Sequence, residues 1–280
     1  MRTIAWKIDN DVLDLSIHSL IMGVLNVTPD SFSDGGEFLD ASAAVARGVE
    51  MAGQGAEIID IGGESTRPGA ESVSTEEELR RVIPVIEQLH DKVDAFISID
   101  TSKSEVARAA MDAGASIVND VTGGTGDSQM FDLVAKRKAA LIIMHMQGNP
   151  RTMQVAPRYV DVVAEVSDFF RQQSERALEC GVDLMTIAFD PGIGFGKTLA
   201  HNLELLRNIE QLRVQERPLV VGVSRKSFLG KLTGTPEMSA RLAPALALSA
   251  LLHSRGANIF RVHEVREHAA AFRVAEELRQ

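Results

Sequence analysis

Eight short apolar runs in this sequence each end in polar or charged residues that could take part in chemistry. In chain order these ends are Asn26, Asp60 with Glu64 just beyond, Asp100, Asn119 with Asp120, His145, Asp190, Ser224 with Arg225 and Lys226, and Arg261 with His263. Carboxylates, an amide and an ammonium group held on rigid strand ends suit a flat heterocycle that carries an amino group, ring N–H groups and a carbonyl. We assign such a ring to four residues: Asp100, Asn119, Asp190 and Lys226. A polar strand end can instead cap the helix that follows it, and this alternative stays open for each of them.

A second group of residues is cationic and suits a phosphate or pyrophosphate. It comprises Arg67, Arg225, Lys226, Arg261 and His263. The formal net charge of the protein is -10, so an anionic ligand needs such a local cluster. Some of these cations could instead pair with Asp60, Glu64 or Asp100. Asn26 and Asp30 could add oxygen ligands for Mg²⁺, which usually keeps several waters.

Several familiar catalytic patterns are missing from the sequence. It contains no Gly-x-Ser-x-Gly elbow and no Cys/His constellation for zinc. The glycines at 192, 194 and 196 do not have the spacing of a nucleotide-binding loop, and a turn in which backbone approaches backbone is the competing interpretation. The acidic net charge also disfavours non-specific nucleic-acid binding. A lone His145 is more often structural than catalytic, and Met144 could line either a ring site or the core.

The elements that must position these residues follow from the hydrophobic pattern. The apolar runs are short and continuous rather than alternating, which is typical of buried parallel strands. We expect strands at residues 20–25, 57–61, 95–99, up to 118, 139–144, 185–189, 219–223 and 258–262. We expect helices at 40–52, 74–89, 129–138, 160–179, 199–213, 239–253 and at the C-terminus. A further helix is expected to follow residue 100, with Thr101 or Ser102 as its N-cap. Eight such units predict an α/β fold, a (β/α)8 TIM barrel whose strand ends converge on one mouth.

The chain is expected to form a single barrel domain over residues 20–280, with residues 1–19 as a short N-terminal cap on its closed end. Neither a membrane-spanning stretch nor a signal peptide is apparent, so we expect a cytoplasmic protein without membrane or nucleic-acid partners. Cys180 is interpreted as a packing residue at a helix end. The helix at 239–253 is apolar around much of its circumference, which indicates either a homodimer face or deep packing. Long loops at 27–39, 62–74 and 146–159 follow strands and belong to the active face.

Seven segments of the sequence resemble the dihydropteroate synthase family, in the order in which that family has them. They are residues 26–36 (NVTPDSFSDGG), 62–69 (GGESTRPG), 100–103 (DTSK), 145–150 (HMQGNP), 190–197 (DPGIGFGK), 224–227 (SRKS) and 261–263 (RVH). The similarity runs from about residue 20 to the C-terminus. It implies a folate-pathway transferase that joins 6-hydroxymethyl-7,8-dihydropterin pyrophosphate to p-aminobenzoate, with Mg²⁺.

The same resemblance implies roles for individual residues. The pterin would be held by Asp100, Asn119, Asp190 and Lys226, with Met144 against the ring. The pyrophosphate and metal would be held by Asn26, Arg261 and His263, with Thr66 and Arg67 nearby. The p-aminobenzoate would be framed by Phe32, Pro68, Phe195 and Ser227. The expected catalytic set is Asn26, Asp100, Lys226, Arg261 and His263.

Two other functions compete with this interpretation. A pterin-binding methyltransferase module would share the fold and the pterin pocket, but it has no pyrophosphate to bind. A non-catalytic paralogue would bind ligands or a partner only. The pyrophosphate-directed residues Arg261 and His263 argue against the first, and the intact loop segments argue against the second. Closure of loops 27–39 and 62–74 over the pterin and pyrophosphate is expected to precede binding of p-aminobenzoate.

Overall fold

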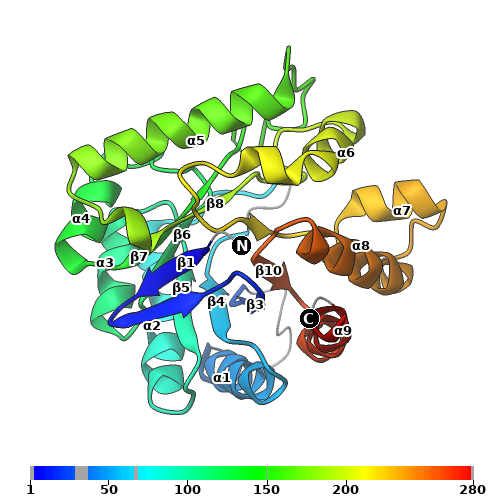
Figure 1. The fold of residues 1–280 in the computed structure, drawn as a ribbon. Helices are drawn as coiled ribbons and strands as arrows, with labels where there is room; N and C mark the ends of the chain where they lie inside the picture. The colour runs from blue at the N-terminus through cyan, green and yellow to red at the C-terminus, as the bar shows by residue number, and fades with distance from the viewer. Residues whose placement is uncertain (1–2, 29–36, 66–68, 150, 279–280) are drawn as a thin grey trace.

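A computed structural model describes residues 3–28, 37–65, 69–149 and 151–278 (Figure 1). Eight parallel strands form one sheet in the order β8-β7-β6-β5-β4-β3-β10-β9. Their bounds are β3 (Leu20–Asn26), β4 (Ile58–Gly62), β5 (Phe96–Asp100), β6 (Ile117–Asp120), β7 (Ala140–Met144), β8 (Ile187–Asp190), β9 (Val220–Val221) and β10 (Ile259–Val262). A bridge between Phe189 of β8 and Leu219, the residue just before β9, joins these two edges of the sheet. The sheet thereby closes into the predicted TIM barrel.

Helices surround this barrel in the alternation that the sequence predicts (Figure 1). Their bounds are α1 (Glu37–Gly53), α2 (Thr75–His90), α3 (Ser104–Asp112), α4 (Met130–Arg137), α5 (Val162–Glu179), α6 (Leu199–Arg207), α7 (Ser227–Thr233), α8 (Leu242–Ser254) and α9 (Val265–Glu277). Short 3-10 turns occupy η2 (Leu184–Thr186), η3 (Ile209–Leu212) and η4 (Met238–Arg241). Within the described residues, no helix is long and apolar enough to cross a membrane.

The first described residues form an antiparallel hairpin of β1 (Ala5–Ile8) and β2 (Asp11–Asp14). Trp6 of this hairpin is fully buried, and its indole N–H donates to the carbonyl of Thr186 at 2.8 Å. It belongs to a hydrophobic cluster with Met22, Ile58 and other residues early in the barrel strands. The hairpin therefore packs on the end of the barrel opposite to the carboxyl ends of the strands.

Several local expectations about the bounds and caps of the elements are wrong. Neither Thr101 nor Ser102 is the cap of α3; the N-cap is Lys103, and the N–H of Ser104 donates instead to Asp127 from a later loop. The helix expected at 199–213 ends at Arg207, after which the chain tightens into η3. The strand expected from residue 185 begins at Ile187, because Asp183 caps the preceding turn η2. The ladder of β9 covers only Val220–Val221, and α7 was not expected.

Cys180 is exposed, so its interpretation as a packing residue is also wrong. It follows α5 and is that helix's C-cap. In contrast, the cap expected for α2 is confirmed, because Ser74 Oγ accepts the N–H of Glu77 at 3.3 Å.

Candidate active site

The carboxyl ends of the barrel strands bring the predicted ring-binding residues together. Parallel pairing sets Asp100 of β5 beside Asn119 of β6, and Met144 of β7 beside Asp190 of β8. All four side chains are buried, as is Asp60 on β4. Because the polar members of this group lie at the end of, or within, otherwise apolar strands, the fold places polar atoms inside a rigid apolar wall.

Arg261 lies at the centre of this group. Its Nε donates to Asp60 Oδ2 at 2.6 Å, and its Nη2 donates to Asp100 Oδ2 at 2.7 Å. The two carboxylates raise the pKa of this guanidinium above its ordinary value, although burial opposes them. The alternative left open by the sequence, pairing with Asp60 and Asp100, therefore holds for Arg261.

Asp60 is a site residue that the sequence indicated only as a competing partner for cations. Its Oδ1 accepts the hydroxyl of Ser98 at 2.7 Å, and its Oδ2 accepts the amide N–H of Asn119 at 3.2 Å as well as Arg261. One carboxylate thus fixes the orientation of three neighbours. The signal in the sequence was a carboxylate inside the apolar run of β4.

Asp100 offers an acceptor that nothing in the described structure uses. Its Oδ1 is buried and has no hydrogen-bond partner among the described residues. Burial raises the pKa of Asp100 to about 7, the Arg261 guanidinium opposes this, and the nearby carboxylate of Asp60 adds to it. A buried polar atom without a partner costs about 1–3 kcal/mol, so a ligand that donates a hydrogen bond there gains that amount.

Asp190 and Lys226 complete the set. Asp190 Oδ1 accepts the N–H of Gly192 at 2.7 Å. Burial raises the pKa of Asp190, while the charges of Lys226, Arg261 and Lys197 lower it. Burial also lowers the pKa of Lys226 to about 8, with the Arg261 charge acting in the same direction. The Lys226 ammonium lies 4.2 Å from the centre of the Phe195 ring, a cation–π contact.

The other described cations assigned to phosphate are less available to bind an anion than the sequence suggests, because acidic side chains already pair with this part of the mouth. Arg225 Nε donates to Glu264 Oε1 at 2.6 Å, a pairing that was not predicted from the sequence. Ser224 Oγ lies 3.0 Å from Nδ1 of His263 and donates to Glu264 Oε2 at 3.0 Å. His263 follows β10 and is partly buried, and Ser227 begins α7 and is exposed. Glu264 therefore orders this part of the mouth.

Other predicted residues lie outside the described residues: Asp30, Phe32, Thr66, Arg67 and Pro68. Their roles, and the expected closure of their two loops, stay predictions. The structure does fix both ends of the second loop, because Lys103 Nζ contacts Glu64 Oε2 at 2.5 Å and the carbonyl of Val73 at 2.7 Å. The same ammonium contacts the buried Glu78 at 2.5 Å.

Asn26 ends β3 beside Gly62 and is partly buried. In the described part of the chain, no group of three or more His, Cys, Asp or Glu residues could hold a metal ion. A single amide oxygen is still compatible with Mg²⁺, which takes most of its ligands from water and substrate phosphates.

The glycine turn after β8 packs directly on backbone, as one of the two interpretations expected. A Cβ on Gly192 would lie 2.0 Å from the carbonyl oxygen of His145, and one on Gly196 would lie 2.3 Å from that of Gln147. Both glycines also have positive φ. Only glycine allows this approach, which joins the turn to the loop after β7.

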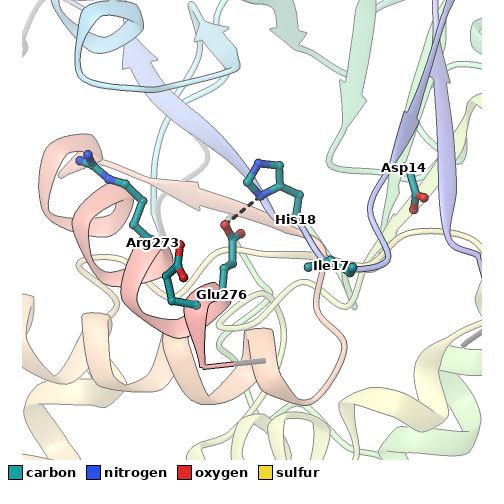
Figure 2. Close-up of a pocket in the computed structure, with 6 residues that line it drawn as sticks. Asp14, Ile17, His18, Arg273 and Glu276 are labelled. Carbon is teal, nitrogen blue, oxygen red and sulfur yellow. Dashed lines mark hydrogen bonds and ion pairs between the residues drawn. The ribbon is translucent and has the colours of Figure 1, made fainter. Parts of the chain in front are cut away.

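A hollow lies at the opposite end of the barrel, between the hairpin and α9 (Figure 2). It has a volume of about 500 Å³ and is lined by Asp14, Ile17, His18, Arg273, Glu276 and Glu277. His18 Nδ1 and Glu276 Oε2 are paired at 2.8 Å (Figure 2). The N–H of Ser19 donates to Glu276 Oε1. This hollow lies away from the carboxyl ends of the strands, so the mouth remains the candidate active site.

Known proteins share both the sequence and this geometry. The family described as pterin binding enzyme matches residues 22–263. Dihydropteroate synthases of Escherichia coli and Synechocystis sp. are 47% and 46% identical, over 94% and 95% of this chain and 93% and 92% of their own. The Xanthomonas albilineans dihydropteroate synthase structure with 4-aminobenzoic acid has a TM-score of 0.92 and 42% identity, with 99% of both chains covered. The structure of that enzyme with 7,8-dihydropteroate has a TM-score of 0.87 and 40% identity, with 98% of both chains covered. The buried acceptors and paired cations at the barrel mouth, together with these similarities, show that the chain belongs to the dihydropteroate synthase family of pterin-binding enzymes.

Proposed function

We propose how the residues at the barrel mouth carry out the reaction of this family. The chain is a transferase of folate biosynthesis. It joins 6-hydroxymethyl-7,8-dihydropterin pyrophosphate to p-aminobenzoate, which gives 7,8-dihydropteroate and pyrophosphate. The observation that carries the residue assignment is the buried, unpartnered Oδ1 of Asp100 beside Asn119.

The pterin ring is assigned to the strand ends. Asp100 Oδ1 and the second carboxylate oxygen of Asp190 accept its N–H groups, and Lys226 donates to its acceptor atoms. Asn119 is oriented by its hydrogen bond to Asp60, and Met144 forms an apolar wall beside Asp190. Since these acceptors are buried, a ring without matching donors leaves them unpaired and binds weakly.

The bond that breaks joins a ring-attached CH₂ to the pyrophosphate oxygen. Because the ring is electron-rich, positive charge can develop on the pterin as pyrophosphate leaves. Asp100 and Asp190 lie where they stabilise this charge, and Lys226 and Arg261 balance them in the resting site. The aniline nitrogen of p-aminobenzoate is already unprotonated at neutral pH, so it needs positioning rather than a base.

The departing pyrophosphate is assigned to Arg261 and His263, with Thr66 and Arg67. The guanidinium of Arg261 has five N–H groups, and two of them donate to Asp60 and Asp100. The others can donate to a phosphate. Asn26 would hold Mg²⁺ through its amide oxygen. When bound, the ion would neutralise charge on the leaving group.

The p-aminobenzoate is assigned to Phe195 and Ser227, with Phe32 and Pro68. Phe195 already lies against Lys226, so the two substrate positions adjoin at this contact. Ser227 opens α7 with its side chain exposed at the mouth.

A homodimer is proposed through α7 and α8. Leu232 and Leu251 are 50% and 47% exposed, large values for leucine. They line an apolar groove of about 120 Å³ between α6, α7 and α8, together with Leu203, Phe228 and Leu248. A second copy would cover this face, and Leu251→Glu should give a monomer in analytical ultracentrifugation. Cytoplasmic location and the absence of nucleic-acid partners remain predictions from the sequence.

The decisive experiment measures pyrophosphate release after both substrates are mixed with the protein. Formation of 7,8-dihydropteroate, detected by chromatography, must match the pyrophosphate released. The hydroxymethyl pterin without pyrophosphate serves as the control and should give no product. A methyltransferase module or a non-catalytic paralogue would give neither product, and that result would refute the proposal.

A further inference from the structure

Lys197 is a buried cation at the mouth that the mechanism above does not use. Its side chain is 2% exposed, and among the described residues it makes no salt bridge. Its Nζ instead lies near four acceptors: the carbonyls of Phe195 at 2.9 Å, Gly192 at 3.1 Å and His145 at 3.2 Å, and His145 Nδ1 at 3.0 Å. Buried charges are ordinarily paired, so a lysine held only by neutral acceptors calls for an explanation.

The partners favour the ammonium form of Lys197. An ammonium group only donates, so His145 Nδ1 accepts and the ring proton lies on Nε2. Burial and the Lys197 charge lower the pKa of His145 to about 3, which keeps the imidazole neutral. Burial lowers the pKa of Lys197 to about 7, whereas the charge of Asp190 opposes this shift.

The acceptors belong to two loops that meet at the site. Gly192 and Phe195 lie in the turn after β8, and His145 begins the loop after β7. Two further bonds join the loops: Gln154 Nε2 donates to the Gly194 carbonyl at 2.7 Å, and Tyr159 Oη donates to the Gly196 carbonyl at 2.9 Å. These two tethers carry no charge, which distinguishes them from Lys197.

The same turn orients Asp190. The N–H of Gly192 donates to Asp190 Oδ1 at 2.7 Å, while the carbonyl of Gly192 accepts from Lys197. Gly192 thus contacts the Asp190 carboxylate through its N–H and the Lys197 ammonium through its carbonyl. The charges of Lys226 and Arg261 also lower the pKa of Asp190, but these two cations are assigned to substrates.

We propose that Lys197 is a positioning residue of the pterin site: its ammonium anchors the turn after β8 and supplies the positive charge behind the Asp190 carboxylate. This inference rests on the proposed function insofar as Asp190 binds the pterin. Lys197 acts through Asp190 and does not touch the substrate. Because the hydrogen-bond partners of Lys197 are neutral, its charge stays available to Asp190 when the other two cations engage pyrophosphate and ring.

The test separates charge from tethering. Lys197→Gln keeps hydrogen-bond donors for the carbonyls but removes the charge, and Gln154→Ala removes a tether of the same turn without any change in charge. Aspartate labelled with ¹³C at its carboxyl group reports each titration by NMR, and the Asp190 signal is assigned by its loss in Asp190→Asn. We expect the pKa of Asp190 to rise by about one unit in Lys197→Gln, as removal of a nearby opposite charge requires, and to stay constant in Gln154→Ala. Lys197→Met replaces Lys197→Gln if the latter does not fold.

A double-mutant cycle on pterin affinity, measured by calorimetry, then links this charge to binding. Measured at a pH below the Asp190 pKa of both proteins, Lys197→Gln should weaken binding about tenfold in the otherwise wild-type protein, because a pKa higher by one unit there reduces the ionised fraction of Asp190 tenfold, and less than about twofold in the Asp190→Asn background. An unchanged Asp190 pKa in Lys197→Gln, or equal rises in both single variants, would overturn the proposal. The NMR titration needs no substrate, so its outcome is independent of whether the proposed reaction is correct.

Discussion

The replacement Asp190→Asn is the sharpest test of the pterin site, because one of the two carboxylate oxygens is already committed. Asp190 Oδ1 accepts the N–H of Gly192 at 2.7 Å. An asparagine must keep its carbonyl oxygen on this donor, so its NH₂ group points to the ligand. A ring N–H would then meet another donor in a buried site.

The size of the effect follows from this geometry. The variant loses one hydrogen bond to a charged acceptor, worth about 1.5–3 kcal/mol, and leaves a ligand donor unpaired. A total near 3 kcal/mol corresponds to roughly a 100-fold loss of pterin affinity. Calorimetry with 7,8-dihydropteroate measures this loss directly, and circular dichroism shows whether the fold is retained.

Asp120→Asn is the matched control. Asp120 is also a buried carboxylate at a strand end, but its oxygens accept from Thr122 and Gly124 within its own turn. This variant should lower the melting temperature while changing pterin affinity little. Unchanged affinity in Asp190→Asn would identify Asp190 as a structural turn residue and refute the assigned pocket, as would equal losses in the two variants.

Three further predictions concern the rest of the mouth. Arg261→Ala and His263→Ala should weaken the pyrophosphate-bearing substrate more than the bare hydroxymethyl pterin, and equal losses in binding titrations would assign Arg261 to the ring. Lys103→Met should raise the KM for p-aminobenzoate severalfold more than that for the pterin substrate, since Lys103 fixes both ends of the loop at 64–73; steady-state kinetics in which both constants rise equally would contradict this. Burial raises the pKa of Asp100 to about 7 from 3.8, so between these pH values the folded protein binds a proton that the unfolded chain does not. The stabilisation that comes from this proton is complete below pH 3.8 and is lost as the pH rises to about 7. Urea unfolding of wild type and Asp100→Asn across this window should show a wild-type advantage that shrinks with pH, and a constant difference would refute the shift.

The sequence by itself determined the barrel and the location of its site. Continuous apolar runs specify buried parallel strands, and parallel strands in a barrel direct their carboxyl ends to one mouth. Asp100, Asn119, Met144 and Asp190 could therefore be placed together although up to 90 positions separate them in the chain. The cap Ser74 and the close backbone approach at the glycine turn were also predictable, because both depend on local chemistry.

Only the tertiary structure decided which charge compensates which. Asp60 binds Arg261 across a separation of 201 positions, and Lys197 is held by carbonyls rather than by a carboxylate. The exact ends of the elements were decided in the same way, since Asp127 rather than Thr101 or Ser102 satisfies the first N–H of α3. A pattern of residue types records burial and backbone preference, whereas the partner of a buried charge depends on which distant side chains the closed barrel brings within hydrogen-bond distance.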